Sequence, residues 1–383
     1  MLNTVTQNAS PRFNSINESR EVKIEIITPV HVGAASEKLL RKGTDYFFVN
    51  NHLYFVDFNK LLKAVLAKGV EMDVVSTHLA NGRVEELQTY LFKTLKIDLN
   101  SISYDVIENF NYEPGTEIRP LIKTGAGKPY ITGSSIKGAV RSVLFNYLFE
   151  KVENINAKSG KELENLLLGK FNESIMRYIR VYDAGFDNLD TGVNFVHLFN
   201  LYNEKTSWES DWKRGFNITA QVFQVEAASS FRLSLAHPLA EIIGKLYKKA
   251  DTLPRHLSAV FTDNPFEHLH QMINYYTRRH IEKELEFFKK YDQLQEATYI
   301  IENLENLLAF THDKESCLLR MAYGSGFHGI TGDWRFENHF ETINKPDEDN
   351  WVYSQTDKRM VPARYKSRRI VNDNLMGFVK LTF

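Results

Sequence analysis

The stretch of sequence that decides the fold is residues 129–141, which read PYITGSSIKGAVR. A short β-type run precedes Gly133, and apolar residues then recur at steps of three and four positions. This period places them on one face of an amphipathic helix. We expect that face to be buried, and it contains Ile136, Ala139, Val140, Val143, Leu144, Tyr147 and Leu148. Ser134 or Ser135 can cap the N-terminus of this helix.

The start of this helix is a candidate site for an anion. The first backbone N–H groups of a helix have no intrahelical partner, and Lys137 and Arg141 are four residues apart, on one face. Two cations there oppose the helix dipole at a cost of about 0.3–1 kcal/mol each, and a bound phosphate would reverse that effect. An ordinary capped helix with solvated Lys and Arg explains the same residues equally well. The phosphate-loop spacing G-x-x-x-x-G-K-[ST] is absent.

Strand patterns flank this helix on both sides. Val22, Ile24 and Ile26 alternate with charged residues, as expected of a half-buried strand. Asn50 and Asn51 separate two aromatic, β-branched runs at 45–49 and 53–56, which predicts a hairpin. A helix capped by a carboxylate should follow at residue 57 and end at the glycine at 69. Further strands are expected at 221–225 and 231–235, paired as a hairpin, and at the end of the chain, 375–383.

These patterns divide the chain into four parts. Residues 1–20 are polar and are expected to be a flexible tail. Residues 21–236 would form an α+β core with insertions, and residues 237–317 a helical subdomain. Residues 318–383 would supply a glycine-rich loop and a last strand that completes the core.

The glycine-rich segment is residues 320–329, RMAYGSGFHG. Successive glycines after a strand can form a nest of backbone N–H groups that binds an anion, and Phe327 and His328 could stack on a base. A structural turn is the simpler interpretation of the same residues. A second loop, residues 123–129, carries Lys123.

His31, just after the first strand, is the most obvious catalytic candidate. No Ser, Cys or second His stands at a telling spacing around it, so a structural or ligand-contacting role is the alternative. Asp183, at the end of a predicted strand, is the other carboxylate of interest. The histidines between 256 and 280 lack the cysteine ligands of a structural zinc site. A basic run at 364–369 can bind phosphate or can be a solvated loop.

Composition restricts the class of protein. Of 383 residues, 43% are hydrophobic and 25% are charged, as is usual for a soluble globular protein. Cys317 is the one cysteine, so no internal disulfide can form, which fits a reducing cytoplasm. No run approaches the roughly 20 apolar residues of a membrane span, and residues 1–20 do not resemble a signal peptide. The net charge of −1 indicates that any RNA binding uses a local basic face.

Four segments together resemble the RAMP superfamily of CRISPR RNA-binding proteins. They are residues 28–33 (TPVHVG), 129–141, 320–327 and 377–381 (GFVKL). The predicted hairpin at 45–57 and the helical region before the glycine-rich segment resemble the family of fifth subunits of type III-A (Csm) effector complexes. Thr132 departs from the pattern, since proline is frequent there, and this should affect loop stiffness.

The resemblance implies a ferredoxin-like β-α-β-β-α-β core with helical insertions. It implies a non-catalytic subunit, without cofactor or metal, that binds the CRISPR RNA (crRNA) at its 3′ side, caps the filament of backbone subunits and supports crRNA maturation. The partners would be crRNA, the backbone RAMP subunit and the small subunit, with target RNA contacted indirectly and no membrane. The RNA-contacting residues would be His31, Lys123, Gly133, Ser134, Ser135, Lys137, Arg141, Arg320, Gly324, Gly326, Phe327 and His328.

Two alternatives stay open. The chain could be a crRNA-processing endoribonuclease of the same superfamily, with His31 as general acid or base beside a bound ribose. It could also be a RAMP subunit of a type III-B complex. Removing the His31 imidazole would abolish cleavage in the first case, and co-purifying partners would identify the second.

Overall fold

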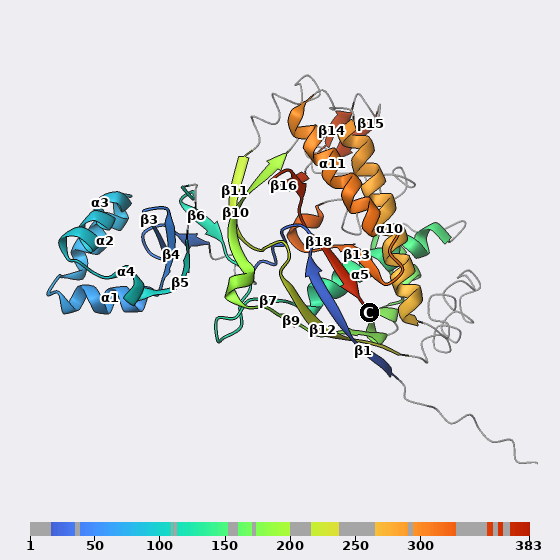
Figure 1. The fold of residues 1–383 in the computed structure, drawn as a ribbon, viewed down its shortest axis with the longest axis horizontal. Helices are drawn as coiled ribbons and strands as arrows, with labels where there is room; N and C mark the ends of the chain where they lie inside the picture. The colour runs from blue at the N-terminus through green and yellow to red at the C-terminus, as the bar shows by residue number, and fades with distance from the viewer. Residues whose placement is uncertain are drawn as a thin grey trace, which may run out of the picture.

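A computed structural model of the protein describes residues 17–34, 39–108, 110, 113–151, 160–170, 174–199, 216–236, 265–289, 294–326, 351–354, 359–362 and 368–383. Its centre is a five-stranded antiparallel sheet in the order β13-β18-β1-β12-β8 (Figure 1). The strands are β1 (Asn17–Ile26), β8 (Ile179–Val181), β12 (Ala228–Ala236), β13 (Ser316–Arg320) and β18 (Phe378–Thr382).

One face of this sheet is covered by α5 (Gly133–Lys151) and α10 (Pro265–Lys289). The predicted helical stripe is confirmed, because its residues from Ile136 to Leu148 are buried, with Tyr147 partly buried. They pack against Val22, Ile24 and Ile26 of β1. The chain order β1-α5-β8-β12-α10-β18, with β1 between β18 and β12, is consistent with the predicted ferredoxin-like core. The α+β class is confirmed.

A second sheet has the order β17-β16-β10-β11-β6-β2. The predicted hairpin between 221–225 and 231–235 is wrong, because the two segments belong to different sheets. β1 and β8 occupy both edges of β12, so β11 pairs instead with β10 and β6. The strands are β2 (Leu40–Arg41), β6 (Glu117–Arg119), β10 (Thr191–Phe199), β11 (Phe216–Phe223), β16 (Arg368–Val371) and β17 (Asn374–Leu375).

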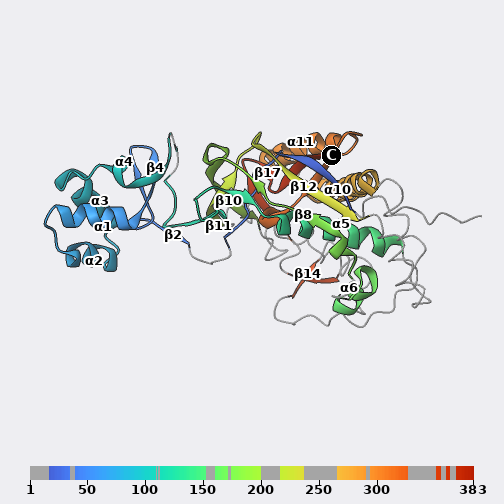
Figure 2. The same cartoon turned by 90° about the horizontal axis from the view of Figure 1, so that it is seen from below.

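Residues 46–107 form a lobe with its own apolar core, seen at the left of Figures 1 and 2. Asn50 and Asn51 have φ of 51° and 61°, so the predicted hairpin turn is confirmed. Asp57 accepts from the backbone N–H groups of Asn59 and Lys60, and thus caps the next helix. The elements are β3 (Tyr46–Val49), β4 (His52–Val56), α1 (Phe58–Ala67), α2 (Met72–Ala80), α3 (Val84–Thr89), a π-helical turn (Tyr90–Thr94), α4 (Leu99–Ile102) and β5 (Ser103–Ile107).

The remaining elements include two further two-stranded sheets, β7 with β9 and β14 with β15. α11 lies beside α10 (Figure 1), and both helices lie within the predicted helical subdomain, residues 237–317, of which 237–264 and 290–293 are outside the described part. β1 begins at Asn17, inside the predicted tail, because pairing with β12 extends to Ala236. The elements are β7 (Tyr130–Ile131), α6 (Gly160–Leu168), β9 (Ala184–Gly185), α11 (Gln295–Phe310), β14 (Trp351–Ser354), β15 (Arg359–Pro362) and 3₁₀ turns at Ile175–Tyr178, Asn188–Asp190 and Ala322–Ser325.

Helix α5 begins differently from the prediction. Thr132, and not Ser134 or Ser135, caps it, because the Thr132 hydroxyl accepts from the Ser135 backbone N–H at 3.1 Å. Asp183 accepts from the Gly133 N–H at 2.7 Å, which places a carboxylate at the positive end of the helix dipole. A Cβ on Gly133 would collide with the Val181 carbonyl oxygen, so strand β8 approaches the helix start too closely for a side chain.

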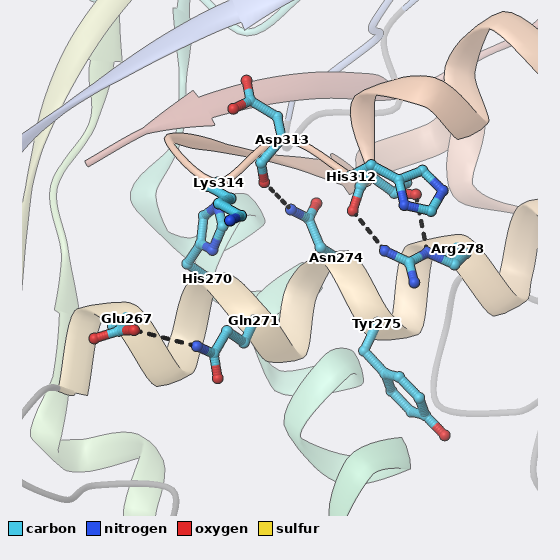
Figure 3. Close-up of a pocket in the computed structure, with 10 residues that line it drawn as sticks. Glu267, His270, Gln271, Asn274, Tyr275, Arg278, His312, Asp313 and Lys314 are labelled. Atoms are coloured by element: carbon cyan, nitrogen blue, oxygen red, sulfur yellow. Dashed lines mark hydrogen bonds between the residues drawn. The ribbon is translucent and has the colours of Figure 1, made fainter.

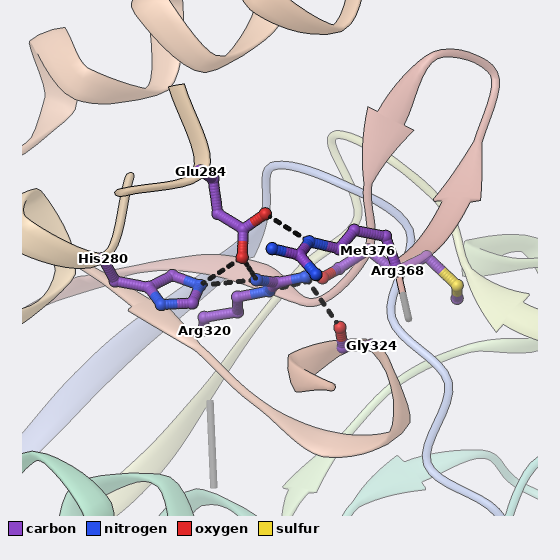
Figure 4. A network of polar contacts seen from close by, with 6 residues as sticks. All are labelled: His280, Glu284, Arg320, Gly324, Arg368 and Met376. Carbon is purple, nitrogen blue, oxygen red and sulfur yellow. Dashed lines mark hydrogen bonds and ion pairs between the residues drawn. The ribbon is translucent and has the colours of Figure 1, made fainter. Parts of the chain in front are cut away.

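A buried ionic network joins α10 to the C-terminal strands (Figure 4). The Arg320 guanidinium donates to the Gly324 and Met376 carbonyls at 3.0 and 3.2 Å. Its Nη1 lies 4.0 Å from Glu284, which also accepts from Arg368 Nε at 2.7 Å. Burial lowers the pKa of Arg320 to about 10, so it stays charged at neutral pH. The network therefore fixes the 3₁₀ turn of the glycine-rich segment, which we call the glycine-rich turn, relative to α10.

The two glycines of α5 should respond to alanine in opposite directions. Gly133→Ala should lower the free energy of unfolding by about 2 kcal/mol or more, because the new methyl group meets backbone. Gly138→Ala should raise it by about 0.5–1 kcal/mol, because nothing lies within 4 Å and alanine is the better helix former. Chemical denaturation followed by circular dichroism measures both. Equal effects of the two substitutions would contradict the close approach of β8.

Removing the carboxylate of the ionic network should destabilise the fold strongly. Glu284→Gln leaves the Arg320 and Arg368 guanidiniums buried without their shared anion, which should cost about 3–5 kcal/mol of unfolding free energy. The matched control is Glu305→Gln, which removes an exposed ion pair to Lys289 and should cost less than about 1 kcal/mol. Urea denaturation of both variants gives the comparison. A loss below about 1 kcal/mol in Glu284→Gln would show that the network does not tie these elements together.

Candidate functional site

The turn after β1 and the glycine-rich turn lie against each other. The Tyr323 N–H donates to the His31 carbonyl at 3.2 Å, and the Gly377 N–H donates to the Pro29 carbonyl at 3.0 Å. The Met321 N–H in turn donates to the Gly377 carbonyl at 2.8 Å. Three of the four segments that resemble the RAMP superfamily, at 28–33, 320–327 and 377–381, therefore meet at one place.

His31 lies inside this junction and is only 3% exposed. Its Nδ1 is hydrogen-bonded to the Gln221 carbonyl at 2.7 Å. Burial lowers the pKa of His31, and the positive charges of Arg119 and Arg369 lower it further, against the raising effect of the Gln221 carbonyl. The imidazole is therefore neutral at neutral pH and holds β11 to the turn after β1.

Three side chains from three segments gather around the aromatic ring of Tyr323. The Arg369 guanidinium lies 3.9 Å from the centre of the Tyr323 ring, and Arg119 lies 5.6 Å from it. His31 meets the same ring edge-on at 5.4 Å. Arg369 also donates to the Tyr323 carbonyl at 2.8 Å. We call His31, Arg119, Tyr323 and Arg369 the Tyr323 cluster.

The Tyr323 cluster has a positive surface. Arg119 is exposed and Arg369 half-buried, and within the described residues no carboxylate lies within 4 Å of either guanidinium. Two cations beside an aromatic ring suit a phosphate and a base of single-stranded RNA. Sequence patterns missed Arg119 because it stands in a three-residue strand without a motif. Arg369 was part of the basic run 364–369, and Tyr323 of the glycine-rich segment.

The other predicted contacts of the glycine-rich segment have structural roles where they are described. Arg320 is 7% exposed and belongs to the buried network, so it does not face solvent as a phosphate contact would. A Cβ on Gly324 would lie 2.5 Å from the Met376 side chain, and Gly326 has a φ of 63°. Both glycines are needed by the backbone itself. Phe327 and His328 lie outside the described residues.

The predicted residues of α5 divide into paired and unpaired groups. Arg141 forms an ion pair with Glu164 of α6. The Gly133 and Ser135 N–H groups are used by Asp183 and Thr132, while Ser134 is exposed. The pKa of Lys137 is lowered, first by burial and then by the charge of Arg180, and no ion pair is described for it. The helix start is thus largely satisfied internally.

Lys123 lies apart from these residues. Its ammonium is 3.7 Å from the Asp105 carboxylate and 5.6 Å from the centre of the Tyr104 ring, so it links the 120s loop to strand β5. α5 does contact the 3₁₀ turn Ala322–Ser325. The structure therefore brings the glycine-rich turn near α5 and His31, but holds Lys123 in a contact of its own.

A polar pocket of about 640 Å³ lies elsewhere, between α10 and the turn before β13 (Figure 3). Its main polar side chains are already engaged: Arg278 donates to the Thr311 carbonyl at 2.9 Å, and Asn274 donates to the Asp313 and Ser316 carbonyls. These bonds fix the turn that follows α11. No group of three or more potential metal ligands occurs in the described part of the chain, and none of its helices is long and apolar enough to span a membrane.

Comparison with known proteins agrees with the sequence segments. A family model described as the RAMP superfamily matches residues 23–336. The protein "CRISPR system Cms protein Csm5" of Streptococcus thermophilus is 28% identical over 196 residues, covering 45% of this chain. The alignment spans about half, 54%, of that relative. The protein of the same name from Methanocaldococcus jannaschii is 24% identical over 326 residues, covering 80% of this chain and 71% of that protein.

The fold has a counterpart among solved structures. A chain of "Cryo-EM structure of Csm-crRNA-target RNA ternary complex in type III-A CRISPR-Cas system" superposes with a TM-score of 0.69 at 18% identity. The match covers 94% of this chain and 99% of that one. Because the family model spans more than half of the sequence and the fold agrees over nearly all of it, the protein belongs to the RAMP superfamily.

Proposed function

We propose that this protein is a non-catalytic crRNA-binding subunit of a type III-A CRISPR effector complex. It would cap the filament of backbone subunits at the 3′ side of the crRNA and support crRNA maturation in the cytoplasm. Its similarity to proteins named Csm5, and to a chain of a Csm–crRNA–target RNA complex, supports this assignment. The backbone RAMP subunit and the small subunit are the proposed protein partners, with target RNA contacted indirectly.

The Tyr323 cluster is the observation that carries the proposal. It presents two guanidiniums and an aromatic ring at the junction of three family-like segments. A guide complex reads its target by base pairing, so its proteins need contacts to the RNA backbone that ignore sequence. Arg119 and Arg369 can supply such phosphate contacts, and the Tyr323 ring can accept a base. Of the predicted residues, Lys137 and Ser134 keep surface positions that suit RNA, whereas Arg320 is assigned a supporting role.

The alternative of a crRNA-processing endoribonuclease needs a group that can exchange a proton with a ribose. His31 is 3% exposed, and its Nδ1 is committed to the Gln221 carbonyl. A general acid or base must come within hydrogen-bond reach of the atom it serves. A binding subunit therefore accounts for the position of His31 better than a nuclease does.

The assignment as a subunit is tested by purifying the tagged protein from its host, sequencing the bound RNA and identifying the partners. We expect CRISPR RNAs together with several RAMP proteins and a large polymerase-like subunit. Partners of type III-B composition would move the protein to that complex. Recovery of the chain alone, without small RNA, would contradict the proposed function.

Arg119 supplies the exposed guanidinium of the Tyr323 cluster. Removing its positive charge should weaken the retention of RNA. Each lost phosphate contact should reduce the slope of log affinity against log salt by about 0.7 for a single strand. We therefore expect Arg119→Ala to lower the slope by about that amount and Arg119→Lys to retain most of it. Lys63→Ala, an exposed lysine of α1 without a described ion pair, is the matched control and should leave the slope unchanged. An Arg119→Ala slope equal to that of the control would remove Arg119 from the site.

Removing the His31 imidazole distinguishes a binding subunit from a nuclease. His31→Ala should loosen the junction between β11 and the turn after β1, and so reduce the amount of assembled complex without changing the length of the crRNA that it carries. A nuclease would instead accumulate unprocessed precursor RNA. Sequencing of the bound RNA ends in wild type and variant measures this, and accumulation of precursor with His31→Ala would favour the alternative.

A further inference from the structure

A second positive surface lies on the outer face of the five-stranded sheet, where β12 pairs with the edge strand β8. Leu233 lies opposite Val181 in the ladder, and the Tyr182 N–H donates to the Arg232 carbonyl at 3.0 Å. Arg232 and Tyr182 therefore lie opposite each other and point to the same face. Arg180 is two residues before Tyr182 along the strand, so it shares that face. We call Arg180, Tyr182 and Arg232 the β8–β12 face.

All three side chains of this face are exposed. Tyr182 is 50% exposed, so much of its ring lies at the surface. The Arg232 guanidinium lies 5.8 Å from the centre of the Tyr182 ring and holds it in place. This contact leaves the guanidinium N–H groups and the remaining ring surface available to a ligand.

Within the described residues the cations of this face have no ion-pair partner. Glu21 stands opposite Arg232 on β1 and accepts from the Ser230 hydroxyl at 2.5 Å, and its carboxylate does not lie within 4 Å of the Arg232 guanidinium. Asp183, the next carboxylate along the chain from Arg180, is engaged by the Gly133 N–H. Lys137, at the start of α5, lies near this edge of the sheet: its pKa is lowered first by burial and then by the positive charge of Arg180. An anionic ligand would relieve the repulsion of these charges.

The unpaired cations of the β8–β12 face differ from many of the other cations on the surface. The chain has a net charge of −1, and many of its cations are paired with carboxylates: Arg20, Arg41, Lys42, Arg141, Arg279, Lys289 and Lys380. A cluster of cations left unpaired around an exposed ring is therefore a local exception. Its neighbours on the same face of β1 and β12 are polar, Ser230 and Glu21, so it lacks the apolar anchors of a protein interface core.

We propose that the β8–β12 face binds single-stranded RNA, with Arg180 and Arg232 on phosphates and a base stacked on Tyr182. This inference rests on the proposed function, and it adds an RNA contact that none of the family-like motifs contains. An aromatic ring between cations is the combination that single-stranded nucleic acid uses, because every base has a stacking face. The contact would be independent of base sequence, as a guide complex requires.

The first test is ultraviolet crosslinking of the RNA in the complex purified with the tagged full-length chain, followed by mass spectrometry. We expect a nucleotide adduct on the peptide that carries Tyr182. The adduct should persist in Tyr182→Phe, which keeps the ring, and disappear in Tyr182→Ala. Adducts confined to other peptides, such as those of the glycine-rich turn, would overturn this inference and leave the proposed function intact. Absence of RNA from the preparation would overturn both.

The second test measures how much the positive charges of the β8–β12 face contribute to RNA binding. Retention of RNA by the complex is followed over a series of wash salt concentrations. Arg180→Ala/Arg232→Ala should lower the slope of log retention against log salt by about 1.4, since two phosphate contacts of about 0.7 each are lost. Lys63→Ala/Lys68→Ala removes the same charge from the exposed surface of α1 and its C-terminus, and should not change the slope. Equal slopes, or loss of a partner subunit with RNA retained, would show that this face does not bind RNA.

Discussion

The buried guanidinium of Arg320 is the constraint on which the surface depends. A charge that is 7% exposed must be surrounded by acceptors, and Arg320 finds them in Gly324, Met376, His280 and Glu284. These acceptors come from the glycine-rich turn, the segment before β18 and α10. One buried charge thereby locks the position of the turn that carries Tyr323, and Arg368 beside it anchors the strand that carries Arg369.

The distribution of charge over the surface depends on which cations are paired with carboxylates. The chain is nearly neutral, so it cannot attract RNA over its whole surface. The described arginines include some that are buried in the network with Glu284, some that form ion pairs on the surface, and a few that are exposed without an ion pair. The last kind gathers at the Tyr323 cluster and on the β8–β12 face. A nearly neutral protein with two local positive surfaces suits the proposed function, in which RNA is bound at those surfaces and the remaining surface is left for protein partners.

Sequence patterns predicted what short-range chemistry determines. The Asn50–Asn51 turn, the Asp57 cap and the buried stripe of α5 depend on residues close together in the chain, and all three are confirmed. The hairpin expected between β11 and β12 failed because strand partners are chosen across the fold, here by β1. Solvent exposure also depends on residues far apart in the sequence. Arg320 was predicted to contact RNA at the surface, but β18 and α10 enclose it. The predicted cap was wrong by two or three positions, because Thr132 and not Ser134 or Ser135 accepts the hydrogen bond at the start of the helix.

The distinction between supporting and contacting residues explains why the motifs identify the family better than the ligand contacts. Gly133, Gly324 and His31 recur in the recognisable segments, yet each is held by backbone close to it: Val181 at the first, Met376 at the second and Gln221 at the third. Such residues support the backbone geometry of this fold. The side chains free to meet RNA, Arg119, Arg180 and Arg232, stand on strands outside the motifs, where the fold requires only an exposed residue. Side chains can change at those positions without disturbing the core, so the motifs fix the scaffold, and the proposed RNA contacts lie on the strands between them.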